Sequence, residues 1–234
     1  MNRMHKVIAS LAGLAVLAAA IVVSFMLLGN SPASVPQNDV NAVATAAPTA
    51  ETTVGQPEVV MDADFAVGYN SVPQLAKAAD VIVRGEATDV SYLDFNTATY
   101  TKVTLKVAKC YKGSIAAGDQ ITIMEVGGIT TMAAVKGDKF GATTKEDADT
   151  QVKVTLEGAP LTQVGEKSLY FLGVGKIDVV PGTYYVPMGA FQGHFKIDSG
   201  VAKRFVPADA SSKYTSLAID ESAVDSTMTQ AAVQ

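Results

Sequence analysis

Alternating apolar and polar residues between Thr99 and Val126 constrain the fold of this chain more than any other feature. In the first half of this stretch apolar residues alternate with lysine and threonine, so one face of a strand is apolar and the other is polar. A turn from Lys112 to Asp119 leads to a second alternating run, which predicts an antiparallel ribbon with one buried face. The apolar face of this ribbon comprises Val103, Leu105, Val107, Ile121 and Ile123.

The chain on both sides of the ribbon predicts one short helix and more strands. Ser71 and Gln74 have the spacing of a capping box, which predicts a helix that ends near Ala79. Gly85 permits a bulge or a sharp barrel bend in the strand that follows. Strands at this spacing, with Gly and Asp turns between them, are typical of an all-β barrel or sandwich. The additional strands are expected at 81–87, 152–156, 168–172, 184–186, 190–197 and 201–206.

We expect the apolar face of the ribbon to form one wall of a single barrel core. A strand with charged residues on one face buries only its other face, and that face needs partners from strands with the same period. The expected partners are Val81, Val83, Leu169 and Phe171.

The amino-terminal segment predicts a membrane anchor. From Val7 to Leu28 no residue carries a formal charge, and the basic residues Arg3 and Lys6 precede this run. A bilayer span takes about 20 apolar residues, whereas the apolar core of a cleaved signal runs about 7 to 15. The positive-inside tendency places the basic flank in the cytoplasm and the rest outside, as a single-pass protein of the cell membrane. The alternative is a long signal, cleaved near Ala33, that releases a secreted domain.

These patterns divide the chain into four segments. Residues 1–29 form the anchor or signal peptide, 30–63 a disordered linker, 64–210 the extracytoplasmic β-barrel domain and 211–234 a polar C-terminal tail. The linker is rich in Ser, Thr, Ala and Pro, and such a segment buries too little apolar surface to offset the entropy of ordering. The tail receives no assigned structure beyond a weak helical pattern at 217–228.

The composition excludes one class of partner and bounds the cysteine chemistry. The net charge is -5, and two of the basic residues lie in the cytoplasmic flank. Nucleic acid is therefore not an expected partner, because its binding requires a basic stripe.

Cys110 is the only cysteine, so no intramolecular disulfide forms. We interpret it as a small core hydrophobe; the alternative is a reactive thiol activated by Lys109 and Lys112.

Three stretches carry a family resemblance: ADVIVRGE at 79–86, KVAKCYKG at 106–113 and GEKSLYFL at 165–172. In this order they resemble the strand signature of netrin-like, TIMP-like OB-fold barrels, including poorly characterised bacterial surface-anchored proteins. The resemblance covers Ser71 to Val206 and describes strands rather than a site. Eukaryotic members inhibit proteases through an N-terminal cysteine that this chain lacks, so protease inhibition is not implied.

The expected fold class is all-β. The domain is expected to be an OB-like antiparallel β-barrel with one short N-terminal helix, and a single transmembrane helix and a flexible linker precede it.

The sequence assigns no catalytic residue, no cofactor and no metal. His194 is the only histidine after the anchor. No second histidine or paired nucleophile accompanies it, so we interpret it as a structural strand residue. Gly127 and Gly128 lack the ending of a phosphate loop and predict a tight turn. A solvated loop is favoured over a calcium site for the acidic residues after them, because their spacing misses the EF-hand pattern. These are Asp138, Glu146, Asp147 and Asp149.

Aromatic residues near strand ends are the candidate ligand-binding residues. An OB barrel binds ligands on one face, commonly with stacking aromatic side chains. The alternative is packing in the core and between strands, since two adjacent tyrosines must point to opposite faces of a strand. The candidates are Tyr92, Tyr100, Tyr184 and Tyr185.

Two functions remain. The favoured one is a membrane-tethered extracytoplasmic β domain with a non-enzymatic binding or envelope-associated role. Its partners are the membrane, through residues 7–28, and a protein, a peptide or an envelope polymer. The alternative is an extracytoplasmic hydrolase that uses acidic residues of the 138–149 loop with Glu125. Two catalytic carboxylates would lie in one cleft with about 5 to 10 Å between them, whereas solvated carboxylates would point away from each other.

Overall fold

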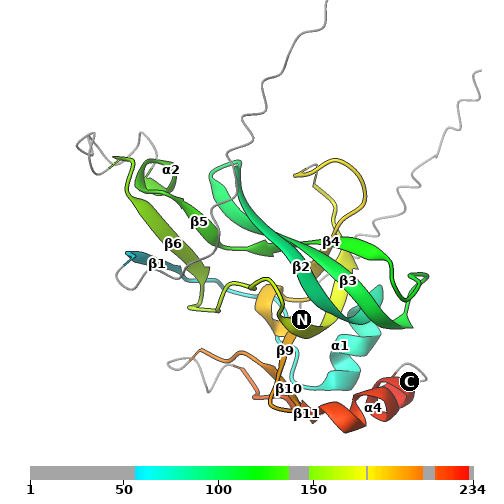
Figure 1. Cartoon of the computed structure of the whole chain (residues 1–234). Helices are drawn as coiled ribbons and strands as arrows, with labels where there is room; N and C mark the ends of the chain where they lie inside the picture. Colours follow the sequence, from blue (N-terminus) through cyan, green and yellow to red (C-terminus); the bar gives the residue numbers. More distant parts are fainter. Residues whose placement is uncertain (1–55, 137–147, 178, 208–213, 232–234) are drawn as a thin grey trace, which may run out of the picture. The chain divides into compact units, whose positions relative to one another are not determined.

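The computed structural model describes residues 56–136, 148–177, 179–207 and 214–231, which belong to one compact unit, 45–234. The first elements are β1 (Glu58–Met61), α1 (Val72–Ala78), β2 (Val81–Phe95), β3 (Ala98–Lys112), β4 (Gln120–Val126), β5 (Gly128–Thr131), α2 (Met132–Lys136) and β6 (Gln151–Leu156). Then follow β7 (Lys167–Val174), β8 (Tyr185–Pro187), η2 (Ala190–Gly193), β9 (His194–Asp198), β10 (Val201–Arg204), β11 (Ala218–Asp220), η3 (Glu221–Ala223) and α4 (Val224–Ala231). The fold is mostly β with few helices, as predicted (Figure 1).

The membrane anchor expected at residues 7–28 lies outside the described residues. Among the helices that the structure does describe, none is both long enough and apolar enough to cross a membrane. The anchor and the topology therefore stay predictions.

The larger sheet has eight strands in the order β11-β10-β9-β7-β2-β3-β4-β8. Strand β8 also pairs with β7, with Val186 opposite Gly173. On its other side β8 pairs in parallel with β4, with Tyr185 opposite Ile123. The hydrogen-bonded circuit of β7, β2, β3, β4 and β8 therefore returns to β7, and we call it the five-strand circuit. Strands β9, β10 and β11 continue the sheet beyond the circuit (Figure 1).

Strands β3 and β4 form the predicted antiparallel ribbon, with Leu105 opposite Ile121. The predicted bulge is also confirmed, because the pairing of β2 with β3 shifts register between Arg84 and Gly85. A Cβ atom at Gly85 would lie 2.4 Å from the carbonyl oxygen of Lys106. Only glycine permits so close an approach of the two backbones.

A hydrophobic core fills the five-strand circuit, and it contains the whole predicted face of the ribbon together with Val81 and Val83. The prediction for β7 is wrong by one residue. Tyr170 and Leu172 belong to this core, whereas Leu169 and Phe171 belong to a second core. Because β7 is buried on both faces, its hydrophobic pattern does not reveal which residues face which core.

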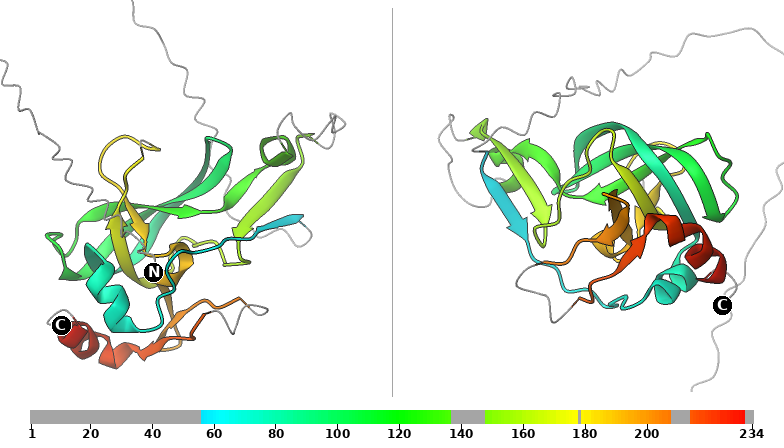
Figure 2. Two further views of the ribbon diagram at one scale, coloured as in Figure 1. Left: turned by 180° about the vertical axis from the view of Figure 1, so that it is seen from behind. Right: turned by 60° about the horizontal axis from the view of Figure 1, so that its bottom comes forward.

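The second core lies beneath helices α1 and α4, which lie side by side (Figure 2). Val224 and Met228 of α4 are fully buried. Their spacing of four residues places both on one face of the helix. The tyrosine hydroxyl of Tyr111 donates a hydrogen bond of 2.6 Å to Asp225, which links α4 to β3. The tail expected at 211–234 thus contributes an ordered strand and helix to the fold.

A smaller sheet has the order β1-β6-β5. Its edge strand β1 pairs in parallel with β6, with Val59 opposite Val154. Residues 58–61 fall within the linker expected at 30–63, so β structure begins before residue 64. The reason is the pairing with β6, which satisfies the backbone groups of a segment too short to signal a strand on its own.

Helix α1 begins as the capping box predicts. Ser71 is the N-cap, and its hydroxyl accepts a hydrogen bond of 3.4 Å from the backbone N–H of Gln74. The side chain of Gln74 accepts one of 2.8 Å from the backbone N–H of Asn70. The cap fixes the start of the helix, whose Leu75 and Ala76 are buried in the second core.

The substitution Leu105→Ala should lower the free energy of unfolding severely, whereas Lys106→Ala should change it little. Leu105 is fully buried in the circuit and Lys106 is exposed on the other face of β3. Truncating a buried leucine typically costs about 2 to 5 kcal/mol, against a domain stability of about 5 to 15 kcal/mol. Urea unfolding of residues 45–234 measures both variants, and small equal effects would mean that the ribbon does not pack on a core.

Candidate functional site

The candidate site is built around His194, the first residue of β9. A strand was expected over 190–197, but Ala190–Gly193 form the 3-10 helix η2. The reason is a turn in which Gly189 and the residue after it have positive φ, 55° and 54°, so the chain leaves the extended conformation. After this turn, His194 lies opposite Tyr170 of β7 in the antiparallel register.

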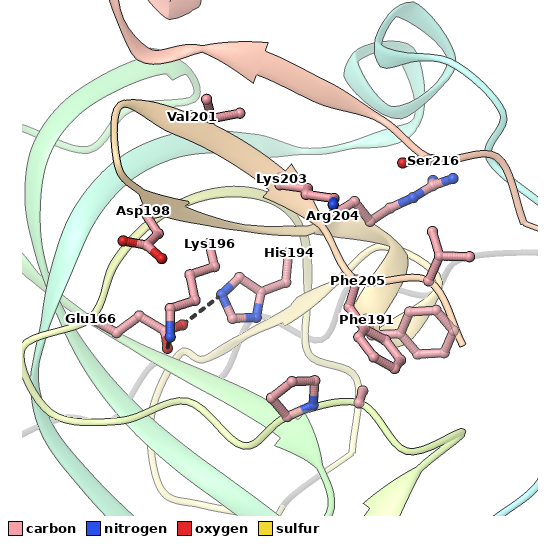
Figure 3. Close-up of a pocket in the computed structure, with 13 residues that line it drawn as sticks. Glu166, Phe191, His194, Lys196, Asp198, Val201, Lys203, Arg204, Phe205 and Ser216 are labelled. Atoms are coloured by element: carbon pink, nitrogen blue, oxygen red, sulfur yellow. Dashed lines mark ion pairs between the residues drawn. The ribbon is translucent and has the colours of Figure 1, made fainter. Parts of the chain in front are cut away.

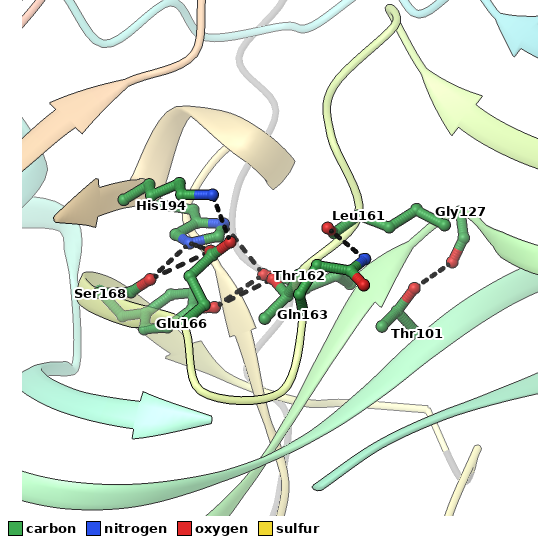
Figure 4. A network of polar contacts seen from close by, with 11 residues as sticks. Thr101, Gly127, Leu161, Thr162, Gln163, Glu166, Ser168 and His194 are labelled. Atoms are coloured by element: carbon green, nitrogen blue, oxygen red, sulfur yellow. Dashed lines mark hydrogen bonds and ion pairs between the residues drawn. The ribbon is translucent and has the colours of Figure 1, made fainter. Parts of the chain in front are cut away.

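Two carboxylates hold the imidazole of His194. Its Nδ1 lies 3.2 Å from Oε1 of Glu125, and its Nε2 lies 3.2 Å from Oε1 of Glu166. The hydroxyl oxygen of Ser168 is 2.9 Å from the same Nε2, and Figure 4 shows Ser168 and Glu166 beside the ring. The ring stacks on Tyr170 with 4.3 Å between centroids and an interplanar angle of 18°. We call these five residues the histidine cluster.

Both carboxylates have further partners. Thr162 donates a hydrogen bond of 2.6 Å to Oε2 of Glu125, and the hydroxyl of Tyr170 donates one of 3.1 Å to Oε1. The ammonium of Lys196 lies 3.1 Å from Oε2 of Glu166. Buried carboxylates require such pairing, because an unpaired buried charge is costly. The cluster is therefore a saturated polar network within a largely apolar fold.

The carboxylates determine the charge of the ring. Burial alone would lower the pKa of His194, but the charges and hydrogen bonds of Glu125 and Glu166 raise that pKa to about 9. Burial would raise the pKa of Glu166, but His194 and Lys196 bring that pKa below its ordinary value. Burial and the charge of Glu125 raise the pKa of Tyr170 well above its ordinary value. At neutral pH the cluster therefore holds an imidazolium ion and a neutral phenol.

These shifts make the stability of the fold depend on pH. A group whose pKa is higher in the folded state stabilises the fold fully below its unfolded value, about 6.5 for histidine. The contribution of His194 is then lost as the pH rises through about 9. Glu166 acts in the opposite direction, because its contribution is lost as the pH falls below its ordinary value of 4.5.

The contacts of His194 resemble those of a serine hydrolase triad. The hydroxyl of Ser168 lies at its Nε2, and the carboxylate of Glu125 lies at its Nδ1. The sequence indicated no such partners for the histidine. Two features oppose catalysis: Glu166 also lies at Nε2 and helps keep the ring protonated, and Ser168 is only 1% exposed. Because a protonated imidazole cannot accept the serine proton, the arrangement fixes strands and a loop better than it activates a nucleophile.

Two pockets meet at His194. The larger, of about 490 Å³, is lined by β9 and β10 and is shown in Figure 3. The smaller, of about 230 Å³, is lined by residues of β4 and β8. Small-molecule sites in proteins usually measure about 300 to 1,000 Å³, so the larger pocket has a suitable size. Both pockets are lined by Ala159, Pro160, Phe191 and His194.

The larger pocket, which we call the β9–β10 pocket, has a polar side and an apolar side. Phe191 and Phe205 meet edge to face with 5.8 Å between centroids, and they form the apolar side. The polar lining comprises Glu166, His194, Lys196, Asp198, Lys203 and Arg204. An apolar wall that faces polar groups is typical of ligand sites.

The candidate tyrosines do not converge on one site. Tyr100 lines the smaller pocket. Tyr92 lies against Gly128, since a Cβ atom there would be 3.0 Å from its ring. Tyr184 is buried with its hydroxyl donating to the carbonyl of Ile177, and Tyr185 packs on the circuit core. For three of the four, the packing alternative describes the contacts better than a ligand platform does.

The other sequence candidates add no second site. Residues 138–147 of the acidic loop lie outside the described residues, which include only Asp149 of its named acids. Within the described part of the chain, no group of three His, Cys, Asp or Glu side chains is arranged to hold a metal ion. Cys110 is half-buried, and its thiol donates to the carbonyl of Lys112 at 3.1 Å.

One signal in the sequence points to the histidine cluster. Glu125 continues the alternation of Ile121 and Ile123, so a carboxylate stands in the series that faces the circuit core. A charge at an inward position of a strand requires a buried partner. Ser168 and Glu166 carry no comparable signal. Ser168 reaches His194 through the pairing of β7 with β9, and Glu166 reaches it from the loop before β7, and the sequence specifies neither.

Comparison of the sequence with family models and with curated proteins finds no match. The function is therefore inferred from the geometry of the β9–β10 pocket and of the histidine cluster beside it.

The substitution Glu125→Gln should lower the pKa of His194 by at least about one unit, because an opposite charge at this distance shifts a pKa by about 1 to 3 units. Imidazole NMR titration of residues 45–234 measures it directly, since His194 is the only histidine in that unit. The matched control is Glu58→Gln, which removes a carboxylate paired with Lys153 on the smaller sheet. A midpoint near 6.5 in the unsubstituted domain would contradict the paired cluster.

Proposed function

We propose that this chain is a membrane-tethered extracytoplasmic β domain that acts by binding a ligand or envelope component in the β9–β10 pocket, without catalysis. The observation that carries the proposal is the pocket itself, which joins an aromatic wall to a row of charged side chains at a histidine with saturated hydrogen bonding. A concave site that combines an apolar wall with placed polar groups is the usual form of a small-ligand site.

The five-strand circuit supports an OB-like barrel as the scaffold. The circuit runs β2-β3-β4-β8-β7 and back to β2. If its five strands are numbered in chain order, this order is 1-2-3-5-4, and the third strand (β4) pairs in parallel with the fifth (β8). The closure of β4 on β8 rests on one residue pair, Ile123 and Tyr185. A five-stranded, partly open Greek-key barrel is the description of an OB fold. The resemblance to netrin-like, TIMP-like barrels is consistent with this order.

The amino-terminal sequence supports the location. The uncharged run at 7–28 has the length of a membrane span and a basic flank before it. The polar segment that follows has the composition of a flexible tether. A tethered domain reaches components of the envelope without leaving the membrane.

The saturation of the histidine cluster supports binding over catalysis. Each nitrogen of His194 faces a carboxylate, and each carboxylate has a further partner from Thr162, Tyr170 or Lys196. An imidazole that two carboxylates keep protonated at neutral pH cannot act as a general base there. The effect of this pairing is to hold one wall of the pocket rigid, which lowers the entropic cost of binding.

Photo-crosslinking of the full chain in intact cells tests the proposal. A benzoylphenylalanine at Ser216, an exposed residue that lines the pocket, should capture an envelope component. The same group at Ser114, an exposed residue of the β3–β4 turn that lines neither pocket, is the matched control. The pocket-filling substitution Val201→Phe should reduce capture from position 216, and external protease should remove the captured product.

Two outcomes would overturn the proposal. Equal capture from positions 216 and 114, unaffected by Val201→Phe, would mean that the pocket is not the binding site. A product that resists protease in intact cells, while a known surface protein is cut, would mean that the domain is not outside.

A second candidate, hydrolysis, has one observation in its favour, the Ser168–His194–Glu125 geometry. A fluorophosphonate probe reacts with activated serines and tests it directly. We expect no labelling of Ser168 at pH 7 or at pH 9.5, because the hydroxyl is buried as well as faced by a protonated ring at neutral pH. Labelling that Ser168→Ala abolishes would establish the hydrolase instead.

A further inference from the structure

We propose that the β9–β10 pocket takes an organic monoanion, an apolar or aromatic body that carries one carboxylate. The inference rests on the proposed function and names the chemical class of its ligand. It is argued from the charges that line the pocket, from a buried arginine without a carboxylate, and from the aromatic wall.

Two lysines face the pocket from neighbouring strands. Lys196 of β9 stands directly opposite Lys203 of β10 in the antiparallel register, and both line the pocket. Like charges directly opposite each other destabilise a sheet. Glu166 compensates Lys196, whereas Lys203 has no acidic partner among the described residues. An anion bound between them would relieve the repulsion.

A third cation is buried behind the wall of the pocket. Arg204 is among the residues around the pocket, but its side chain is only 1% exposed, and it stands opposite Phe195, on the face of β10 away from Lys203. Its terminal nitrogens donate to the backbone carbonyls of Tyr69, at 2.6 Å, and of Thr215, and its Nε has no hydrogen-bond partner among the described residues. No carboxylate of the described chain pairs with this guanidinium, although buried charges are normally paired. The positive charge thus remains uncompensated beside the pocket.

The acidic residues of the lining limit the charge of the ligand. Glu166 is engaged by His194 and Lys196, so it offsets those cations rather than Lys203. Asp198 is exposed at the end of β9 and also lines the pocket. A dianion such as a phosphate monoester would meet repulsion from Asp198, whereas a single carboxylate placed nearer Lys203 would meet less. The lining therefore favours a monoanion.

The opposite wall determines the body of the ligand. Phe191 and Phe205 present two edge-to-face rings to the pocket. Burial of apolar surface against such a wall contributes about 25 cal/mol per Å². Aromatic walls favour flat or aromatic bodies, since rings stack at defined distances. A pocket with positive charge on one side and aromatic rings on the other therefore favours a ligand that is an amphipathic acid.

Isothermal titration calorimetry of the full chain in lipid nanodiscs tests the inference, with the heat of empty nanodiscs subtracted. The probes are naphthoate, its neutral amide naphthamide and the cationic naphthylmethylammonium. We expect naphthoate to bind about tenfold more tightly than naphthamide, because hydrogen bonds to charged groups are the stronger ones. The ammonium should bind most weakly of the three.

Two variants locate the charge. Lys203→Gln should weaken naphthoate binding about fivefold and leave naphthamide unchanged, since it removes one exposed charge. Lys106→Gln is the matched control, because Lys106 is an exposed strand lysine that does not line this pocket. Val201→Phe, which places a larger side chain in the lining of the pocket, should weaken naphthoate and naphthamide alike.

The outcomes separate this inference from the proposed function. Equal affinity for naphthoate and naphthamide, or equal effects of Lys203→Gln and Lys106→Gln, would overturn the anion assignment. Absence of binding by all three probes, with Ser216 crosslinking retained, would overturn the ligand class and leave the binding function standing. Loss of the crosslinking difference between Ser216 and Ser114 would overturn the proposed function itself.

Discussion

The burial of strand β7 on both faces is the constraint on which the rest of the structure depends. β7 pairs with β2, β8 and β9. Tyr170 and Leu172 on one face belong to the circuit core, while Leu169 and Phe171 on the other belong to the core under the helices. A strand buried on both faces has no solvent side, so each neighbouring element must cover it. The closure of the sheet and the docking of α1 and α4 both follow from this requirement.

The histidine cluster forms where this strand begins, at the edge of its apolar run. Glu166 and Ser168 lie near the start of β7, and Glu125 lies near the end of β4. An imidazolium between two carboxylates is tolerated in such a place because the charges pair and the remaining lone pairs accept hydrogen bonds. Removing one partner would leave an unpaired buried charge, so the network specifies how β4, β7 and β9 are placed relative to each other.

The sequence predicts the parts of the fold whose signal is local. The alternation around Leu105, the capping box at Ser71 and the bulge at Gly85 each depend on a few neighbouring residues, and all three are confirmed. The orientation of β7 and the strand β1 depend on pairing between distant segments, so hydrophobic pattern alone misses them. The site was missed for the same reason, because His194 receives its partners from β4, β7 and the loop before β7.

Tyr170 of β7 points into the circuit, and His194 stands opposite it on β9. On β9 the same face of the sheet carries His194, Lys196 and Asp198, and there the circuit no longer covers it. The pocket therefore lies where a core face becomes a surface face, and its composition changes from apolar to charged at that point. Because Glu125 and Glu166 pair with both nitrogens of His194, the histidine adds rigidity but neither an uncompensated charge nor a free donor. In the proposed binding mode, recognition is thus left to Lys203, to the charge of the buried Arg204 and to the aromatic wall.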